Sequence, residues 1–263
     1  MAEFTERAYE LNEVSWWSHW ADVVWLGPDA YVLLSRDFDE YFFNRAGFLR
    51  VGPDSEVLLE KMEGEFGKKK LTPYVFVQSE SLYPRLLQKF SKSGYRISDQ
   101  MSVMEMGEPS FSVNPQVTLE MGNKERITEW VDVYVRAFYG TVELESKVTP
   151  VLRRVSKIPE VGLLLAYLDG MVVGALALLR TDGMCGVYCV GTVPEVRGRR
   201  VASTMLEFAS RLAVKEGRKL ILQTILSDSV EPLYLRAGFR RVCLKELFVK
   251  EGGALKSQKG GVP

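Results

Sequence analysis

The spacing of apolar residues in the second part of the chain predicts alternating helices and strands. Val201, Met205, Phe208 and Leu212 recur at intervals of four, three and four residues, which places them on one face of a helix over about 199–216. Asp169-Gly170 separates two apolar runs and indicates a hairpin between strands at 161–168 and 171–179. The same patterns predict strands at 117–121, 185–193, 219–225 and 241–249, and helices at 124–139, 147–157 and 229–237. This mixed order excludes an all-α or all-β fold.

The first part of the chain is also mixed. Its aromatic-rich beginning is interpreted as helices to about residue 50, followed by a helix over 54–67 and a strand at Tyr74–Gln78. A helix over 81–93 has Pro84 in its first turn, where the missing N–H costs little, and a strand over 95–106 follows. Two prolines and small polar residues then interrupt the pattern at 107–115. We therefore expect an N-terminal domain over 1–108 and a second domain over 109–263.

Charge is distributed unevenly between these parts. The chain of 263 residues has 34 Lys and Arg and 34 Asp and Glu, and so no net charge. Residues 1–110 hold 12 basic and 18 acidic side chains, a net charge of −6, whereas 111–263 hold 22 and 16, a net charge of +6. The balanced total argues against a nucleic-acid coat protein, and the basic part suits a compact, phosphate-rich small molecule.

The sequence gives no sign of a membrane, disulfide or metal protein. It has neither an apolar run of about 18–20 residues nor an apolar stretch near its N-terminus that resembles a signal peptide, so a cytoplasmic protein with no membrane partner is expected. Cys185, Cys189 and Cys243 are an odd number of thiols, which favours reduced cysteines. We interpret Cys185 and Cys189 as packing residues and His19, in an aromatic cluster, as structural, so no metal is expected.

The segment that carries chemistry is 191–203, between the strand at 185–193 and the helix that follows. A strand that leads into a helix N-terminus gathers unpaired backbone N–H groups at the positive end of the helix dipole, which makes an anion site. Arg197, Arg199 and Arg200 add fork-shaped donors for phosphate oxygens. The small residues Gly198, Ala202 and Ser203 allow close approach of a ligand to the backbone.

Two motifs in this region resemble the GNAT acetyltransferases. Arg197-Gly-Arg-Arg-Val-Ala202 resembles the Arg/Gln-x-x-Gly-x-Gly/Ala loop that binds the pyrophosphate of acyl-CoA, with Arg200 in place of the central glycine. An arginine in the right-handed helical conformation there still offers its N–H. Downstream, Pro232-Leu-Tyr-Leu-Arg-Ala-Gly-Phe239 resembles the Leu-Tyr-x-x-x-Gly-Phe signature of the same family. The resemblance covers slightly more than half of the chain and implies a mixed central sheet flanked by helices.

The resemblance implies direct transfer of an acyl group, with acetyl expected, from acetyl-CoA as co-substrate to a primary amine of a small molecule or protein. No acyl-enzyme intermediate and no nucleic acid are implied. Val190, Gly191, Thr192 and Val193 would hold the thioester and pantetheine, and the loop from Arg197 to Ser203, Val201 included, would hold the phosphates. Tyr234 is the expected proton donor to the departing thiolate; the alternative is a ring that packs under the last strand.

Other positions leave alternatives open. Ser227 stands where the family often has an asparagine that contacts the cofactor. Glu143 and Glu145 are candidates for a general base or for acceptor binding, or are solvated loop carboxylates. Arg200 and the missing asparagine suggest an alternative hypothesis, in which the protein is a catalytically silent CoA-binding regulatory or scaffolding protein.

The N-terminal part contains two candidate internal repeats. Arg45-Ala-Gly-Phe48 copies Arg236-Ala-Gly-Phe239, but the better parallel aligns 74–106 with 220–249, each a strand, a helix and a strand. This half therefore resembles the back portion of a degenerate GNAT domain. Because 1–110 contains no Arg-x-x-Gly-x-Gly/Ala motif, we expect no CoA there.

Overall fold

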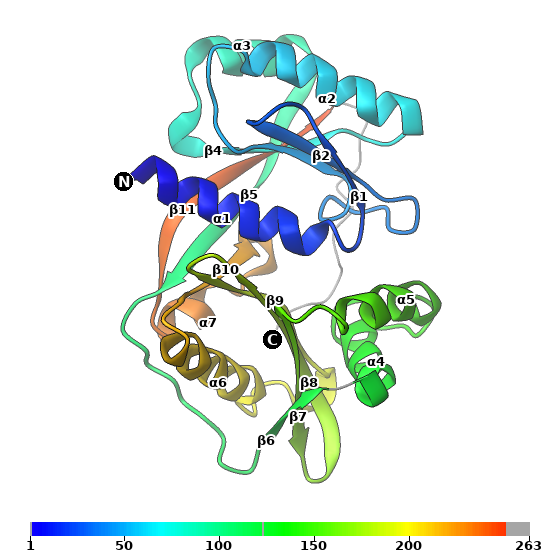
Figure 1. Cartoon of the computed structure of the whole chain (residues 1–263), viewed down its shortest axis with the longest axis vertical. Helices are drawn as coiled ribbons and strands as arrows, with labels where there is room; N and C mark the ends of the chain where they lie inside the picture. The colour runs from blue at the N-terminus through cyan, green and yellow to red at the C-terminus, as the bar shows by residue number, and fades with distance from the viewer. Residues whose placement is uncertain (1, 123, 251–263) are drawn as a thin grey trace. The chain divides into compact units, whose positions relative to one another are not determined.

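The computed structural model describes residues 2–122 and 124–250, and the chain forms two compact units (Figure 1). The first unit comprises residues up to Val103 together with 225–227 and the end of the last strand from Cys243. The second comprises 104–224 and 228–242. Neither unit is continuous in sequence, and the domain boundary between 108 and 109 stays a prediction.

The first unit is a mixed sheet with helices on both sides. Its elements are α1 (Ala2–Trp17), β1 (Asp22–Trp25), β2 (Ala30–Leu34), β3 (Arg45–Phe48), α2 (Ser55–Lys69), β4 (Tyr74–Gln78), a 3-10 turn (Ser79–Ser81), α3 (Pro84–Lys92) and most of β5 (Tyr95–Met106). The end of β11 (Phe239–Lys250) completes the order β1-β2-β3-β4-β11-β5. The pairs β1–β2, β2–β3 and β4–β11 are antiparallel, whereas β3 and β4 are parallel.

The expectation of helices to about residue 50 is wrong, because α1 ends at Trp17 and three strands follow. The run Ala30–Leu34 is buried at all five positions, so it lacks the in-out alternation by which a half-exposed strand is recognised. The turn between β1 and β2, at Gly27 and Pro28, is closed by the Leu26 N–H, which donates to the Ala30 carbonyl at 2.9 Å. Short, fully apolar runs of this kind fit a buried helix or a buried strand equally well from periodicity alone.

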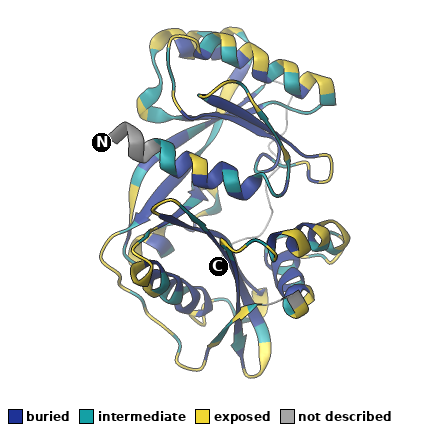
Figure 2. Ribbon diagram, in the orientation of Figure 1, coloured by how far each residue is buried: buried dark blue, intermediate teal, exposed yellow. Residues whose placement is uncertain are grey.

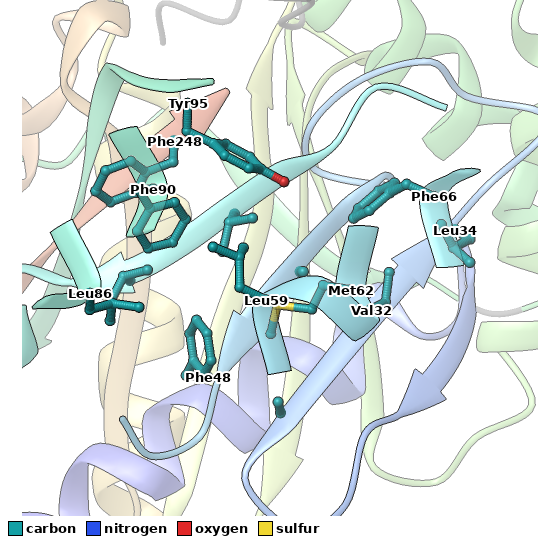
Figure 3. Close-up of a cluster of buried hydrophobic side chains, with 14 residues drawn as sticks. Val32, Leu34, Phe48, Leu59, Met62, Phe66, Leu86, Phe90, Tyr95 and Phe248 are labelled. Carbon is teal, nitrogen blue, oxygen red and sulfur yellow. The ribbon is translucent and has the colours of Figure 1, made fainter. Parts of the chain in front are cut away.

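Alternate residues of the first sheet face two different layers. Val75 and Val77 of β4 join a cluster with α2 and α3, in which Phe90 stacks on Phe248 at 4.0 Å (Figure 3). Tyr74 and Phe76 point to the other face, which α1 covers (Figure 1). The period of two in a strand thus builds a core on each side of the sheet.

A buried cluster of charged side chains lies beneath α1 and includes Lys245 of the last strand. Lys245 of β11 binds Glu10 and Glu13 of α1, the latter at 2.6 Å, and Glu13 also lies 2.6 Å from Arg45. All four side chains are at most 3% exposed. Burial opposes the charge of Glu13, but Arg45 and Lys245 more than offset it and lower its pKa. The two carboxylates likewise raise the pKa of Lys245 in spite of burial, so this lysine keeps its charge.

The second unit confirms the predicted elements. These are β6 (Thr118–Gly122), a 3-10 turn (Lys124–Arg126), α4 (Ile127–Phe138), α5 (Glu145–Val155), β7 (Val161–Leu168), β8 (Met171–Thr181), β9 (Met184–Thr192), a 3-10 turn (Pro194–Val196), α6 (Val201–Lys215), β10 (Lys219–Ile225), a 3-10 turn (Leu226–Asp228), α7 (Glu231–Arg236) and the start of β11. The strand order is β10-β9-β8-β7-β6, and β9 and β10 are parallel. Predicted and observed bounds differ by at most three residues in this unit.

Helices cover both faces of the second sheet. Helices α4 and α5 lie on one side and α6 on the other (Figure 1), and the central strands between them are buried (Figure 2). Gly174 of β8 permits the close approach of α6, since a Cβ at this position would lie 2.7 Å from Cγ1 of Val201. The first turn of α6 is therefore seated directly on the sheet.

Both units repeat one order of elements and form a mixed α+β fold, as expected. In each, three antiparallel strands lead through a helix to a parallel fourth strand, and then through a second helix to a last strand. The duplicated letters do not correspond in structure, because Arg45–Phe48 is strand β3 whereas Arg236 ends α7. Residues 74–106 and 220–249 do share the strand–helix–strand order.

Candidate functional site

Strands β9 and β10 pair only at their beginnings. The paired residues run from Met184–Lys219 to Val187–Leu222, although β9 continues to Thr192. A bulge lies in this later part of β9, where Cys189 has a φ of 53° and the register against β8 shifts. Bulges bend a strand and increase its twist. The end of β9 is thereby left free to receive a ligand on the side of β10.

The loop after β9 presents a group of unpaired backbone donors. Within the described chain, no hydrogen bond is donated by the N–H groups of Gly198, Arg200, Val201, Ala202 and Ser203. Gly198 and Arg200 have φ values of 79° and 63°, so the backbone turns through the left-handed region twice just before α6. Successive N–H groups in such a turn, at the positive end of a helix, form an anion-binding concavity.

Arg200 is in the left-handed conformation, with φ 63° and ψ 23°, and not in the right-handed one expected from the sequence. A side chain at this conformation costs about 1 kcal/mol, which is why the family motif has glycine there. Thr204 helps to hold the turn, because its hydroxyl donates to the Arg200 carbonyl at 2.8 Å. The Arg200 N–H is nevertheless among the unpaired donors.

A pocket of about 250 Å³ opens onto these donors. It is lined by Ser110, Ser112, Thr192, Val196, Gly198, Arg200, Val201, Ala202, Ser203, Leu233, Arg236 and Ala237. Thr192 is only 3% exposed, and its hydroxyl oxygen has no hydrogen-bond partner within the described chain. A buried hydroxyl without a partner is uncommon, so this group points to a polar ligand in the pocket.

The predicted arginines have different surroundings. Arg197 donates to the carbonyls of Ala137, at 2.9 Å, and Thr192, at 3.4 Å, so its guanidinium ties the loop to the end of α4. Arg199 lies 3.6 Å from Asp169 and does not line the pocket. Arg200 lines it and has no ion pair in the part of the chain that the structure describes. Two of the three arginines expected at the phosphates are thus directed elsewhere.

Other predicted residues lie outside the pocket lining. Val190, in β9, and Val193, just after this strand, are both buried, and Gly191 lies against α4, where a Cβ would come 3.0 Å from that of Ala137. The hydroxyl of Ser227 donates to Asp99 in the first unit. Glu143 is exposed and Glu145 is half-buried at the start of α5. The structure therefore assigns none of these side chains to the pocket.

Tyr234 is buried on α7, next in the chain to the lining residue Leu233. Its ring meets Phe239 edge-on at 5.9 Å. Burial, with a smaller contribution from Asp228, raises the pKa of Tyr234 well above its ordinary value of 10. Its hydroxyl therefore remains protonated at neutral pH, as a proton donor requires.

Sequence reasoning missed three polar or basic residues of the pocket wall, and a fourth residue, Asn114, that supports it. Ser110 and Ser112 belong to the segment interpreted only as a domain boundary, and their approach to α6 and α7 has no local signal. Arg236 lines the pocket and forms no ion pair among the described residues. It was missed because a basic residue in the last turn of a helix is ordinarily explained by its favourable interaction with the helix dipole. Asn114 is absent from the lining, yet it donates to the Arg199 carbonyl at 3.0 Å.

The described residues contain no cluster of three or more metal-ligating side chains. Cys185, Cys189 and Cys243 are not in disulfides, and burial raises the pKa of Cys185 to about 11 and that of Cys243 to about 12. In the part of the chain described, no helix combines the length and apolarity of a membrane span.

Comparison with known proteins finds a family model that matches part of the second unit. Residues 159–241 match the model of the acetyltransferase (GNAT) domain. Curated protein sequences give no significant match. The segment matched includes the loop at 197–203 and Tyr234. The chain therefore contains a GNAT-type acetyltransferase domain.

Solved structures extend the likeness in fold to most of the chain. A GCN5-related N-acetyltransferase from Kribbella flavida has a TM-score of 0.68 at 19% identity, over 94% of this chain and 96% of that chain. A second from Sphaerobacter thermophilus has a TM-score of 0.65 at 19% identity, over 90% and 85%. A tandem GNAT protein from the clavulanic acid biosynthesis pathway has a TM-score of 0.58 at 11% identity, over 81% and 76%. These likenesses show the GNAT fold.

Proposed function

We propose that this protein transfers an acyl group, with acetyl expected, directly from acyl-CoA to a primary amine of a small molecule or protein. The observation that carries the proposal is the pocket at the start of α6. It joins five unpaired N–H groups, two arginines without ion pairs and the orphaned hydroxyl of Thr192. These groups fit a diphosphate, because backbone donors at a helix N-terminus and guanidinium groups are its usual partners.

Each part of the site has a role in this proposal. The backbone of Gly198 and of Val201–Ser203 would hold the pyrophosphate, with Arg200 and Arg236 as further cations. The free end of β9, from Val190 to Val193, would hold pantetheine and the thioester. Acyl-CoA supplies the activated carbonyl: the amine nitrogen forms the new bond to the acyl carbon, and the carbon–sulfur bond breaks. Tyr234 donates its hydroxyl proton to the departing sulfur, and the amine gives up its own proton to water or to a carboxylate.

The first unit is proposed to be a degenerate copy that binds no CoA. Its loop after β3 leads into α2 as the loop after β9 leads into α6. There, however, the N–H of Gly52 is bonded to the Ser55 hydroxyl at 2.9 Å, and Glu56 occupies the first turn of α2. Glu56 pairs with Arg85 at 2.9 Å beside a hollow of about 340 Å³. The negative charge of Glu56 lies at the positive end of the α2 dipole, where it would repel a phosphate.

Titration calorimetry and turnover together test the proposed function. Acetyl-CoA should bind to the full chain, and pooled primary amines should then release free CoA. Tyr234→Phe should lower kcat on the order of 100-fold with little change in acetyl-CoA affinity, because it removes only the proton donor. Tyr167→Phe, which removes a hydroxyl that contacts Glu129 outside the pocket, is the matched control and should leave kcat unchanged.

The outcomes separate the alternatives. Absence of acetyl-CoA binding would overturn both the enzyme and a silent CoA-binding protein. Binding without CoA release by any amine would favour the silent protein, for which Arg200 at the glycine position is the motivating observation. Release that is unaffected by Tyr234→Phe would remove Tyr234 from the mechanism while the transferase stands.

A further inference from the structure

The segment Gly107–Gln116, here called the strap, follows β5 within the second unit and passes beside the pocket. At its beginning it is fixed to the end of α7. The Gly107 N–H donates to the Gly238 carbonyl at 2.9 Å, and the Ser110 N–H donates to the Ala237 carbonyl at 3.0 Å. The approach is so close that a Cβ on Gly238 would lie 2.0 Å from the Glu108 carbonyl oxygen. A glycine is therefore required at position 238, which has a φ of 100° and lies against the first residues of the strap.

The end of the strap is fixed to the start of α6 through Asn114. The Asn114 side-chain amide donates to the Arg199 carbonyl at 3.0 Å, and its N–H donates to the Thr204 hydroxyl at 3.0 Å. The side-chain oxygen of Asn114 also accepts the Gln116 N–H at 2.9 Å. Since Thr204 in turn binds the Arg200 carbonyl, Asn114 braces the left-handed turn that presents the unpaired donors.

Ser110, at the first attachment, and Ser112, between the two attachments, line the pocket. Both residues are exposed, and neither side chain has a hydrogen bond within the described chain. They lie in the same pocket as the buried, unpartnered hydroxyl of Thr192. Three hydroxyl groups with free hydrogen-bonding capacity thus line a cavity that also has Arg200 and Arg236 in its wall, which is the chemistry of a phosphate site.

We propose that the strap is a wall of the cofactor site: Ser110 and Ser112 donate to phosphate oxygens of CoA, and Asn114 is a positioning residue that latches the strap to the phosphate loop. This inference rests on the proposed function. It assigns ligand binding to a segment near the start of the second unit. Cofactor affinity then depends on a segment outside the motifs that define the family.

Calorimetry with CoA on the full chain tests the latch. Asn114→Ala removes two side-chain hydrogen bonds and should weaken CoA binding about tenfold. Gln116→Ala is the matched control: it truncates an exposed amide two residues further along the same strap, whose side chain makes no contact used by the latch, and should leave affinity unchanged. The double variant Ser110→Ala/Ser112→Ala should also weaken binding about tenfold.

The strap fails as a proposal if wild-type protein binds CoA and both the Asn114→Ala and the double serine variants bind it equally well. If wild-type protein does not bind CoA, the proposed function fails instead, so the two failures are distinguishable. Should Asn114→Ala not fold, Asn114→Asp takes its place, because it keeps the acceptor for Gln116 and loses only the donation to Arg199.

Limited proteolysis gives a readout that needs no turnover. Chymotrypsin cuts after Phe111, which lies in the strap between its two attachments and is half-buried. CoA should slow the appearance of fragments 1–111 and 112–263 in wild-type protein, and Asn114→Ala should speed it in the absence of CoA. Equal cleavage with and without CoA would overturn the strap as part of the site.

Discussion

At the scale of the residue, Arg200 combines an unfavourable backbone conformation with a position in the anion pocket. Its φ of 63° is one that glycine adopts at no cost. Arg200→Gly should therefore raise the free energy of unfolding by up to about 1 kcal/mol, while the loss of the cation weakens CoA binding. Denaturant unfolding and calorimetry measure the two effects.

The neighbouring arginine is the control for this change. Arg199 is not in the left-handed region, so Arg199→Gly should lower the free energy of unfolding by about 0.5–1 kcal/mol through the added freedom of the unfolded chain. Equal effects of the two substitutions on stability would contradict the strain assigned to Arg200. The sequence located this arginine in the phosphate motif, but its conformation depends on Thr204 and Asn114, which local pattern does not reveal.

At the scale of the element, the seat of α6 on β8 depends on the missing side chain of Gly174. Gly174→Ala would place a methyl group 2.7 Å from Val201 and 3.1 Å from Met205. The first turn of α6 must shift, so we expect the free energy of unfolding to fall by about 1–3 kcal/mol and CoA to bind more weakly. Thermal unfolding and calorimetry test this expectation.

Gly64→Ala is the opposite case. Gly64 lies within α2, and a Cβ there meets no atom within 4 Å. Because alanine is the better helix former, this substitution should raise the free energy of unfolding by about 0.5–1 kcal/mol without changing the affinity for CoA. A stabilising effect at Gly174 as well would show that α6 adjusts freely.

Elements with a clear period were predictable from the sequence, and those without one were not. The helical spacing in α6 and the turn signal between β7 and β8 gave the positions of these elements within two residues. The run at β2 is buried on both faces and has no period to read. The pocket wall at Ser110 was missed because polar linker composition describes a segment's local preference and not the helices that it lies against. Family resemblance located the phosphate loop, but geometry alone showed that Arg197 binds carbonyl groups.

At the scale of the whole molecule, the buried ionic cluster makes stability depend on pH. The lowered pKa of Glu13 means that its contribution is present above its ordinary pKa of 4.5 and is lost as pH falls. The raised pKa of Lys245 means that its contribution is full below its ordinary pKa of 10.5 and is lost as pH rises. The free energy of unfolding should therefore be highest between about pH 5 and pH 10, as urea unfolding across that range would measure.

Lys245→Met tests the cluster directly. It leaves the two buried carboxylates of the cluster with one cation, Arg45, and with the Tyr31 hydroxyl that donates to Glu10 at 2.6 Å, so the free energy of unfolding should fall by about 3–5 kcal/mol. Lys250→Met on the same strand removes an ion pair with Glu63 in which the lysine side chain is 38% exposed. This change should lower the free energy of unfolding by less than about 1 kcal/mol. Similar losses for both lysines would show that the buried cluster contributes no more than a surface pair.

The membership of β11 in the first unit has a consequence for biosynthesis. Residues 245–249 of this strand pair with β4, and Lys245 neutralises carboxylates on α1. A ribosome delivers α1, Arg45 and β4 well before these partners, so the nascent first unit waits with an open strand edge and with two acids that have Arg45 but not yet Lys245. Chaperones have that interval in which to bind it, and a chain stalled before Lys245 would be an aggregation hazard.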